Sequence, residues 1–338
     1  MTKIDLHGKL ATTVVGSFPL TDSKNNMKKA IDDQISANID YITYGQLKDM
    51  NKMFLDPLIT QKIGFGKINE EYWIIDELKE LNNPITLEYL DLLKEHVKET
   101  AKNVKGYKIQ ITGAITLSSV LKLAKDTFAI EYDDFLLSVA DVVKKIAQFY
   151  EKAGADIIAI DEPSLTYAMW LGKESDILIE CINREFSGIK KCLKGMHACG
   201  KLIGVSEILL ETDVDYFDHE FVLHPNNIEE YKKKDLEKYD KMIGFGSVRT
   251  SLPPLELVSI KEGKKSIDSV IESKESIKKH IMKGITEYGY KNLIISPDCG
   301  FGGIKQYLPE ENAQKIAFLK LKNMCDALSE IKKEIKLE

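Results

Sequence analysis

The chain is predicted to fold as a (β/α)8 TIM barrel, in which eight parallel strands alternate with helices and close into a ring. Two observations predict this fold. Short apolar, β-branched runs recur along the 338 residues, and each ends in or just before Gly, Pro or a polar residue, as strands do. Segments with helical periodicity lie between most of these runs. The expected strands are Ala11–Pro19, Asp40–Gln46, Lys108–Gly113, Asp156–Pro163, Cys192–Gly200, Val214–Phe221, Lys241–Val248 and Leu293–Gly300.

One of the intervening segments, residues 135–149, carries a regular helical pattern. Its apolar residues recur three to four positions apart, and charged residues lie on the other side of the helix. The apolar residues are Phe135, Val139, Val142, Ile146 and Phe149, and the charged ones are Asp141, Lys144 and Lys145. We therefore expect an amphipathic helix that lies on the sheet.

The length predicts one barrel with additions. A bare barrel needs about 250 residues, so the chain has room for insertions and long loops. The two segments that exceed ordinary connections are Leu55–Pro84 and Thr250–Ser269, and both are expected to hang over the mouth of the barrel. No second domain is apparent, so residues 1–338 are expected to form a single domain.

Charge and hydropathy exclude several classes of partner. The formal net charge is -6 and the two signs are interspersed, so no basic face is available for nucleic acid. No apolar run approaches the roughly 20 residues that a membrane span needs, and the amino terminus lacks the apolar core of a signal peptide. We expect a cytoplasmic protein that binds neither nucleic acid nor membrane.

Four residues at the ends of expected strands are candidate metal ligands: His197, Cys199, Glu220 and Cys299. Imidazole, thiolate and carboxylate donors suit zinc. Strand carboxyl ends converge on one barrel mouth, so ligands distant in sequence can meet there. The alternative for Glu220 is that His219 is the ligand, because adjacent strand residues face opposite sides and only one can point into the mouth.

The remaining cysteines, Cys181, Cys192 and Cys325, are expected to be packing residues. Gly300-Phe301-Gly302-Gly303 lacks the Lys-Ser/Thr of a nucleotide-binding loop, and its glycines are expected to turn the chain sharply behind Cys299.

Five motifs follow one another from the first expected strand to the last. They are Thr12-Thr13-Val14-Val15-Gly16-Ser17-Phe18-Pro19, Ile160-Asp161-Glu162-Pro163, His197-x-Cys199, Asp218-His219-Glu220-Phe221 and Pro297-Asp298-Cys299-Gly300. Together and in this order, they resemble the catalytic barrel of the cobalamin-independent methionine synthase family, in its short, single-barrel, archaeal-like form. The resemblance implies a zinc-dependent methyltransferase that alkylates a thiol, in most members that of homocysteine. Coordination to zinc would supply the reactive thiolate, whose unperturbed pKa is about 8.5.

The resemblance also implies how homocysteine is held. It places Ser17 and the Gly16 backbone near the substrate carboxylate and Asp161 near the ammonium group, in accord with charge-assisted hydrogen bonding. Gln46 stands where folate-using members have a Glu that contacts the amine. The alternative for Asp161 is a helix N-cap before Pro163.

Two departures concern the methyl donor. Folate-using members have an aromatic residue shortly after a Gly-Pro-x-Thr turn, whereas here Gly113-Ala114-Ile115-Thr116 is followed by Leu117-Ser118-Ser119-Val120. They also have a histidine near strand seven that protonates the leaving folate, whereas this segment reads Arg249-Thr250-Ser251-Leu252. A methylcobalamin or methylated corrinoid protein is therefore the expected donor, because a cobalt(I) corrinoid leaves without protonation.

Several alternatives accompany this interpretation. The acceptor could be another thiol such as coenzyme M, or methyltetrahydrofolate could serve as donor with a partner protein. From a different class, the chain could be a non-catalytic corrinoid-binding or metal-binding partner. Arg249 could hold a carboxylate or phosphate of the donor or of a partner, or form an ion pair that pins the Thr250–Ser269 loop.

Overall fold

The computed structural model describes residues 3–100 and 103–337, which form two compact units. The first unit contains the start of the chain up to Asp5, Lys48–Asp91 and Ile109–Phe217. The second contains Leu6–Leu47, Leu92–Lys108 and Asp218–Glu338. The expectation of one domain over residues 1–338 stays a prediction.

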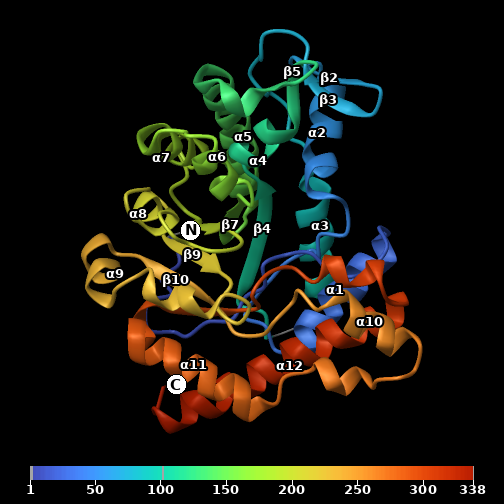
Figure 1. Cartoon of the computed structure of the whole chain (residues 1–338), viewed down its shortest axis with the longest axis vertical. Helices are drawn as coiled ribbons and strands as arrows, with labels where there is room; N and C mark the ends of the chain where they lie inside the picture. Colours follow the sequence, from blue (N-terminus) through green and yellow to red (C-terminus); the bar gives the residue numbers. More distant parts are fainter. Residues whose placement is uncertain (1–2, 101–102, 338) are drawn as a thin grey trace. The chain divides into compact units, whose positions relative to one another are not determined.

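The main sheet has seven strands in the order β1-β4-β7-β8-β9-β10-β11 (Figure 1). β1 pairs with β4, β7 with β8, and β10 with β11, all in parallel. The strands are β1 (Tyr41–Ile42), β4 (Gly106–Thr112), β7 (Ile157–Asp161), β8 (Leu193–His197), β9 (Tyr216–His219), β10 (Met242–Gly246) and β11 (Leu293–Ser296). Each lies at a predicted strand, and only β4 begins before its predicted range.

The predicted first strand, Ala11–Pro19, forms isolated bridges rather than a regular strand. Thr12 pairs in parallel with Ile295 of β11, and Thr13 pairs in parallel with Tyr41 of β1. Side chains reinforce this pairing, since the Thr13 hydroxyl donates to the Tyr41 carbonyl at 2.9 Å. The segment therefore takes the eighth strand position between two edge strands, and the fold is the predicted (β/α)8 barrel.

The first unit carries a second sheet that the sequence analysis missed. The Leu55–Pro84 addition, for which no strand was predicted, contains two strands joined by Asn69 and Glu70, whose φ angles are 50° and 66°. Positive φ at both loop residues is the geometry that suits a two-residue hairpin. The sheet order is β2-β3-β5-β6, with β2 (Phe65–Ile68), β3 (Glu71–Ile74), β5 (Leu121–Ala124) and β6 (Thr127–Phe128).

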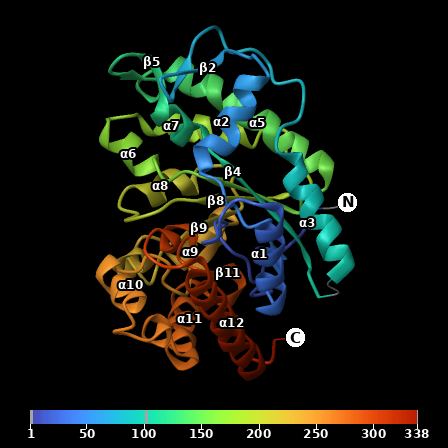
Figure 2. The same ribbon diagram turned by 90° about the vertical axis from the view of Figure 1, so that its right-hand side faces the viewer.

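The helices of the first unit include α5 (Asp133–Ala153), which matches the predicted amphipathic helix. Val139, Val142 and Ile146 are buried as expected, whereas Phe135 is 37% exposed and lies at the edge of the buried face. α5 packs along α7 (Figure 2). The other helical segments of this unit are α2 (Met50–Thr60), α4 (Ala114–Val120), η1 (Ala129–Glu131), α6 (Leu165–Trp170), α7 (Ser175–Glu185) and α8 (Val205–Leu210).

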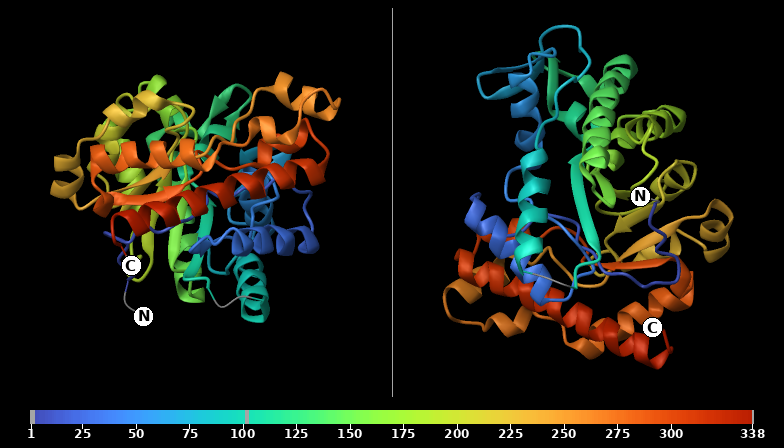
Figure 3. Two further views of the ribbon diagram at one scale, coloured as in Figure 1. Left: turned by 90° about the horizontal axis from the view of Figure 1, so that it is seen from below. Right: turned by 180° about the vertical axis from the view of Figure 1, so that it is seen from behind.

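In the second unit, α11 and α12 run side by side (Figure 3), and α1 contacts α12. The Thr250–Ser269 addition is largely helical and forms α10 and the start of η3. α3 (Leu87–Thr100) begins in the first unit and continues in the second. The helical segments of the second unit are α1 (Lys24–Ser36), η2 (Pro225–Glu229), α9 (Lys233–Tyr239), α10 (Pro254–Lys261), η3 (Ile267–Val270), α11 (Lys274–Tyr288), η4 (Tyr290–Asn292), η5 (Gly302–Gln306) and α12 (Glu310–Glu334).

Within the described parts of the chain, no helix has the length and apolar character that crossing a membrane requires.

Candidate metal and substrate site

His197 and Cys199 lie together at the carboxyl end of β8, in the first unit. The Nε2 atom of His197 is 3.0 Å from the Sγ atom of Cys199. The His197 carbonyl accepts a hydrogen bond of 2.8 Å from the Glu162 amide, which ties the end of β8 to the end of β7. Gly200 follows with φ +86°, a left-handed conformation that glycine adopts without strain. One nitrogen and one sulfur donor are thus held close together by a strand end.

Glu220 and Cys299 follow β9 and β11 in the second unit. Glu220 is buried, and its Oε2 atom lies 3.6 Å from Nε2 of His224, a residue that the sequence analysis did not single out. The side chains of Cys199 and Cys299 are partly exposed, whereas those of Cys181, Cys192 and Cys325 are buried, as expected for packing residues. Burial raises the pKa of the Cys192 and Cys325 thiols to about 12, which makes them poor metal ligands.

The side chain of His219 occupies a packed environment. It is fully buried, its Nε2 atom lies 3.0 Å from the Tyr231 hydroxyl, and its ring stacks on Tyr231 with 5.8 Å between centroids. Since neighbouring strand residues face opposite sides, this packing favours Glu220 over His219 as a ligand.

Asp298 lies between β11 and Cys299, in the motif Pro297-Asp298-Cys299-Gly300, and the sequence predicted no role for it. It is fully buried, and its carboxylate accepts hydrogen bonds from three successive backbone amides. The donors are Phe221 and Val222 at 2.9 Å each and Leu223 at 2.7 Å. Burial raises the pKa of Asp298 to about 7, and the three amides counteract that rise.

Ser17 and Gln46 pair in parallel within the second unit, and Gly16 is buried beside them in the chain. The Ser17 hydroxyl accepts a hydrogen bond from the Gly302 amide at 3.2 Å. A Cβ atom on Gly300 would lie 2.1 Å from that hydroxyl, so glycine is needed there for close approach. Gly300, Gly302 and Gly303 do not have positive φ, so the expected turn behind Cys299 does not use the left-handed region.

Asp161 is the last residue of β7 and is 6% exposed. The N-cap of the following helix, α6, is Ser164, so the alternative that Asp161 caps this helix is wrong. Its register partner in β8 is His197, which places a predicted substrate residue next to a predicted metal ligand in the first unit.

Glu162, next to Asp161, is a capping carboxylate that the sequence analysis missed. It is fully buried and accepts hydrogen bonds from the Ile115 amide at 2.8 Å, the Thr116 amide at 2.7 Å and the Thr116 hydroxyl at 2.6 Å. The Ala114 amide donates to Glu185 at 2.5 Å. Burial raises the pKa of Glu162 to about 7 and that of Glu185 well above its usual value. The signal in the sequence was Gly113, where a Cβ atom would lie 2.1 Å from Glu162.

Arg249 lies beyond β10 in the second unit. Its backbone amide donates to Glu272 at 3.0 Å, and the other oxygen of Glu272 accepts from Lys320 at 2.6 Å. The guanidinium of Arg249 forms no ion pair within residues 3–100 and 103–337, so the alternative of a pinning ion pair is not observed there.

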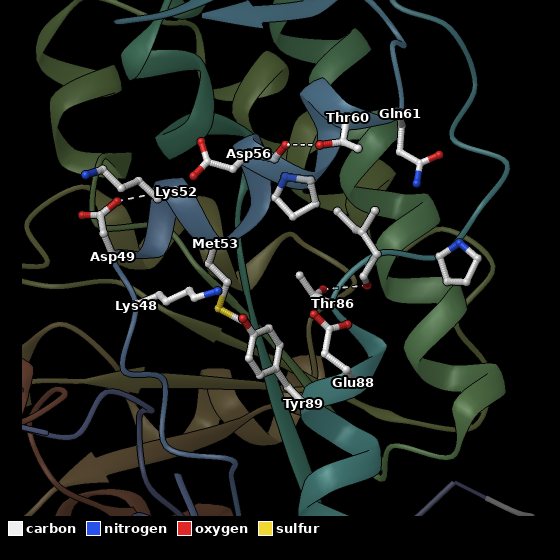
Figure 4. Close-up of a pocket in the computed structure, with 13 residues that line it drawn as sticks. Lys48, Asp49, Lys52, Met53, Asp56, Thr60, Gln61, Thr86, Glu88 and Tyr89 are labelled. Carbon is white, nitrogen blue, oxygen red and sulfur yellow. Dashed lines mark hydrogen bonds between the residues drawn. The ribbon is translucent and has the colours of Figure 1, made fainter. Parts of the chain in front are cut away.

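A cavity of about 650 Å³ lies in the first unit between α2 and the start of α3 (Figure 4). Its lining carries both signs of charge, with Lys48, Lys52, Asp56 and Glu88 among the lining residues. None of the predicted site residues lines this cavity, so the cavity does not coincide with the predicted metal and substrate site.

The comparisons with known proteins agree on a family. Residues 84–330 match the family described as the catalytic domain of cobalamin-independent synthase. A methionine synthase of Methanothermobacter marburgensis is 29% identical over 341 residues, covering 95% of this chain and 100% of that protein. A methionine synthase of Pyrococcus furiosus is 27% identical over 270 residues, covering 78% of this chain and 67% of that protein.

Among solved structures, a B12-independent methionine synthase from a Shewanella species, in complex with selenomethionine, matches with a TM-score of 0.69. Its identity is 17%, and the match covers 97% of this chain and 99% of that one, so it bears on the fold alone. The family match itself spans most of the chain, from just before α3 to near the end of α12, and includes all four predicted metal ligands. The protein therefore belongs to the cobalamin-independent synthase family and is an enzyme of that family.

Proposed function

We propose that this enzyme methylates the thiol of homocysteine to form methionine, with the help of a bound zinc ion. The observation that carries the proposal is the His197 and Cys199 pair at the end of β8, whose donor atoms lie 3.0 Å apart in a member of this family. The curated relatives named above are methionine synthases, which supports the same reaction.

Zinc fits the residues that are present. We propose His197, Cys199 and Cys299 as three ligands of the ion, because their side chains could hold a metal, and Glu220 as the fourth. Nitrogen and thiolate donors with one carboxylate are typical of zinc sites. A bound zinc ion would hold the homocysteine sulfur as a thiolate, the reactive form of a thiol. Glu220, the only oxygen donor of the four, is the ligand we expect to yield to substrate.

The other polar residues bind and orient the amino acid part of homocysteine. Asp161 accepts hydrogen bonds from the ammonium group, and the Gly16 backbone and Ser17 hydroxyl donate to the carboxylate. Gln46, paired with Ser17, offers an amide oxygen to the same ammonium. Coenzyme M has a sulfonate and no ammonium, so Asp161 favours homocysteine over that thiol.

The methyl donor is a separate part of the proposal. The family's description as cobalamin-independent conflicts with the methylcobalamin or methylated corrinoid protein expected from the sequence, and the comparisons give that donor no support. The sequence departures nevertheless stand, because α4 carries no aromatic residue and Arg249 replaces the expected histidine. Methyltetrahydrofolate and methylcobalamin are therefore tested as equal candidates.

The test uses purified, zinc-loaded protein with homocysteine and each donor in turn, and mass spectrometry detects methionine. We expect methionine with homocysteine and no methylated product with coenzyme M. Methylation of coenzyme M in place of homocysteine, or no transfer from either donor, would contradict the proposal.

The metal is tested by elemental analysis. We expect about one zinc per chain in the wild-type protein, and loss of zinc and activity together in Cys199→Ser and Cys299→Ser. Cys325→Ser is the matched control, since Cys325 is buried in α12, and it should retain zinc. Full zinc retention in both ligand variants would remove the metal site from the proposal.

A further inference from the structure

We propose that Asp298 is a positioning residue that holds the Glu220 backbone in a shape ready for metal binding before the ion arrives. The inference rests on the zinc site of the proposed function. It concerns only residues of the second unit.

The first observation is the direction of three hydrogen bonds. Both oxygens of the Asp298 carboxylate are used, because Oδ1 accepts from Phe221 and Val222 and Oδ2 accepts from Leu223. These amides directly follow Glu220 and lie beyond the end of β9, where Asp298 accepts all three of their hydrogen bonds. A single carboxylate thus replaces the sheet as the partner of this backbone.

The second observation is that Asp298 is itself fixed. Its backbone amide donates to the Val248 carbonyl at 2.9 Å, and its side chain is fully buried. Room for the carboxylate depends on Gly246, where a Cβ atom would lie 2.3 Å from Oδ1 of Asp298. The partner of the three amides is therefore part of the rigid end of the barrel sheet.

The third observation is that the Glu220 carbonyl is held independently. The side-chain amide of Asn227, itself 3% exposed, donates to this carbonyl at 2.8 Å. The Glu220 backbone is thus restrained on its carbonyl and through the amides that follow it. Its carboxylate lies 3.6 Å from Nε2 of His224, so the backbone contacts to Asn227 and Asp298 leave the carboxylate itself to other partners.

These contacts tie two proposed ligands to one group. Cys299 directly follows Asp298, and Glu220 directly precedes the three amides that Asp298 binds. Partners behind metal ligands commonly change metal affinity when they are removed, because they fix the orientation of the ligands. Asp298 therefore sets the positions of the Glu220 and Cys299 backbones relative to each other.

The test replaces zinc with cobalt(II), whose visible spectrum reports the number and kind of ligands. Asp298→Asn keeps the shape of the side chain but presents an NH2 group to at least one backbone amide. We expect its zinc affinity, from competition with a chelator, to fall about 10- to 100-fold. Its cobalt spectrum should change in the same way as that of Glu220→Gln, with the cysteine charge-transfer bands retained.

The double variant Asp298→Asn/Glu220→Gln decides whether the two residues act through one another. We expect it to bind zinc no more weakly than Glu220→Gln alone, since the clamp, the Asp298 carboxylate with the three amides that it binds, then has no Glu220 carboxylate to align with Cys299. Additive losses, or a wild-type cobalt spectrum in Asp298→Asn, would overturn the inference.

A measurement on the wild-type chain does not depend on the folding of any variant. In metal-free protein, the amides of Phe221, Val222 and Leu223 should exchange slowly with deuterium although they lie outside the sheet. Protection that appears only after zinc is added would show that the clamp is not preformed. Absence of metal binding by the wild type would instead contradict the proposed function, which separates the two failures.

Discussion

At the scale of single residues, we predict that Asp161 selects an amino acid as the methyl acceptor by binding its ammonium group. It is almost fully buried at the end of β7, beside His197 in the sheet register. We expect Asp161→Asn to weaken homocysteine binding by about 1 to 3 kcal/mol, the scale of a charge-assisted hydrogen bond. Zinc content should be unchanged. Calorimetry measures the affinity, and an unaltered value would exclude Asp161 from ammonium binding.

Arg249 is the residue-scale candidate for the methyl donor. The Glu272 carboxylate accepts a hydrogen bond from the Arg249 backbone amide and forms an ion pair with Lys320, whereas the Arg249 guanidinium has no ion pair among the described residues. Guanidinium binds carboxylate or phosphate with a two-pronged geometry that lysine lacks. We expect Arg249→Lys to raise the KM for the donor while homocysteine affinity and zinc content stay constant.

The control for this variant is the paired arginine on α7. Arg184 forms ion pairs with Glu180 and Asp141, so Arg184→Lys should leave the KM for the donor unchanged. If both variants lose the same stability and neither changes donor kinetics, Arg249 has a structural role only.

At the scale of elements, two buried carboxyl groups join α4, β7 and α7. Glu162 binds the first amides of α4, and Glu185, the last residue of α7, accepts from Ala114 in the same turn. The Glu162 backbone in turn binds the end of β8. Two carboxyl groups that are buried close together cannot both be ionised without a large cost in free energy, so one of them retains a proton. The stability of this junction therefore depends on pH.

Glu185 gives that dependence a sign. Its folded pKa lies well above the value of 4.5 that applies to the unfolded chain. Above pH 4.5 the folded state therefore binds more protons than the unfolded state, and the stability contributed by the protonated group is lost as pH rises. Glutamine imitates the neutral acid. Between about pH 5 and 7, we expect the free energy of unfolding of Glu185→Gln to rise relative to that of the wild type by up to about 1.4 kcal/mol per pH unit.

Denaturant unfolding at several pH values measures this difference. Glu180→Gln is the matched control on α7, because Glu180 is an exposed partner of Arg184. It should show the wild-type dependence on pH. A Glu185→Gln curve parallel to the wild-type curve would mean that Glu185 is ionised in the folded protein.

At the scale of the whole molecule, the barrel interior of the second unit contains a buried ion pair. Lys108 of β4 and Asp218 of β9 are 3.4 Å apart and almost fully buried. The Lys108 ammonium also donates to the Val14 carbonyl at 2.7 Å, and Asp218 accepts from the Ser296 hydroxyl at 2.6 Å. These bonds connect the irregular first strand position to three regular strands.

We expect Lys108→Met to destabilise the protein by about 3 to 5 kcal/mol, because it leaves Asp218 charged and buried without its cation. The surface pair Lys105 and Asp40 is the control, with Lys105 52% exposed. Lys105→Met should cost less than about 1 kcal/mol. Urea midpoints give both values, and equal small losses would mean that the interior pair contributes nothing specific.

Sequence patterns were sufficient where burial alone decides the structure. β7, β8, β10 and β11 are fully buried or nearly so, and runs of apolar residues ending in turn signals located each of them. The same patterns placed His197, Cys199, Glu220 and Cys299 at strand ends. Local hydrophobic periodicity determines both the existence of such strands and the residues that follow their carboxyl ends.

Tertiary structure decided the features that depend on pairs distant in sequence. Asp298 reaches Phe221, Glu162 reaches Ile115, and Ser17 reaches Gly302, and no local pattern specifies which amide each acceptor binds. The β2 and β3 hairpin likewise depends on positive φ at Asn69 and Glu70, without the usual glycine. The sequence by itself determined the barrel and its candidate ligands. The hydrogen bonds that hold those residues form only when the folding chain brings distant polar groups together in the interior, because every buried polar group must then find a hydrogen-bond partner.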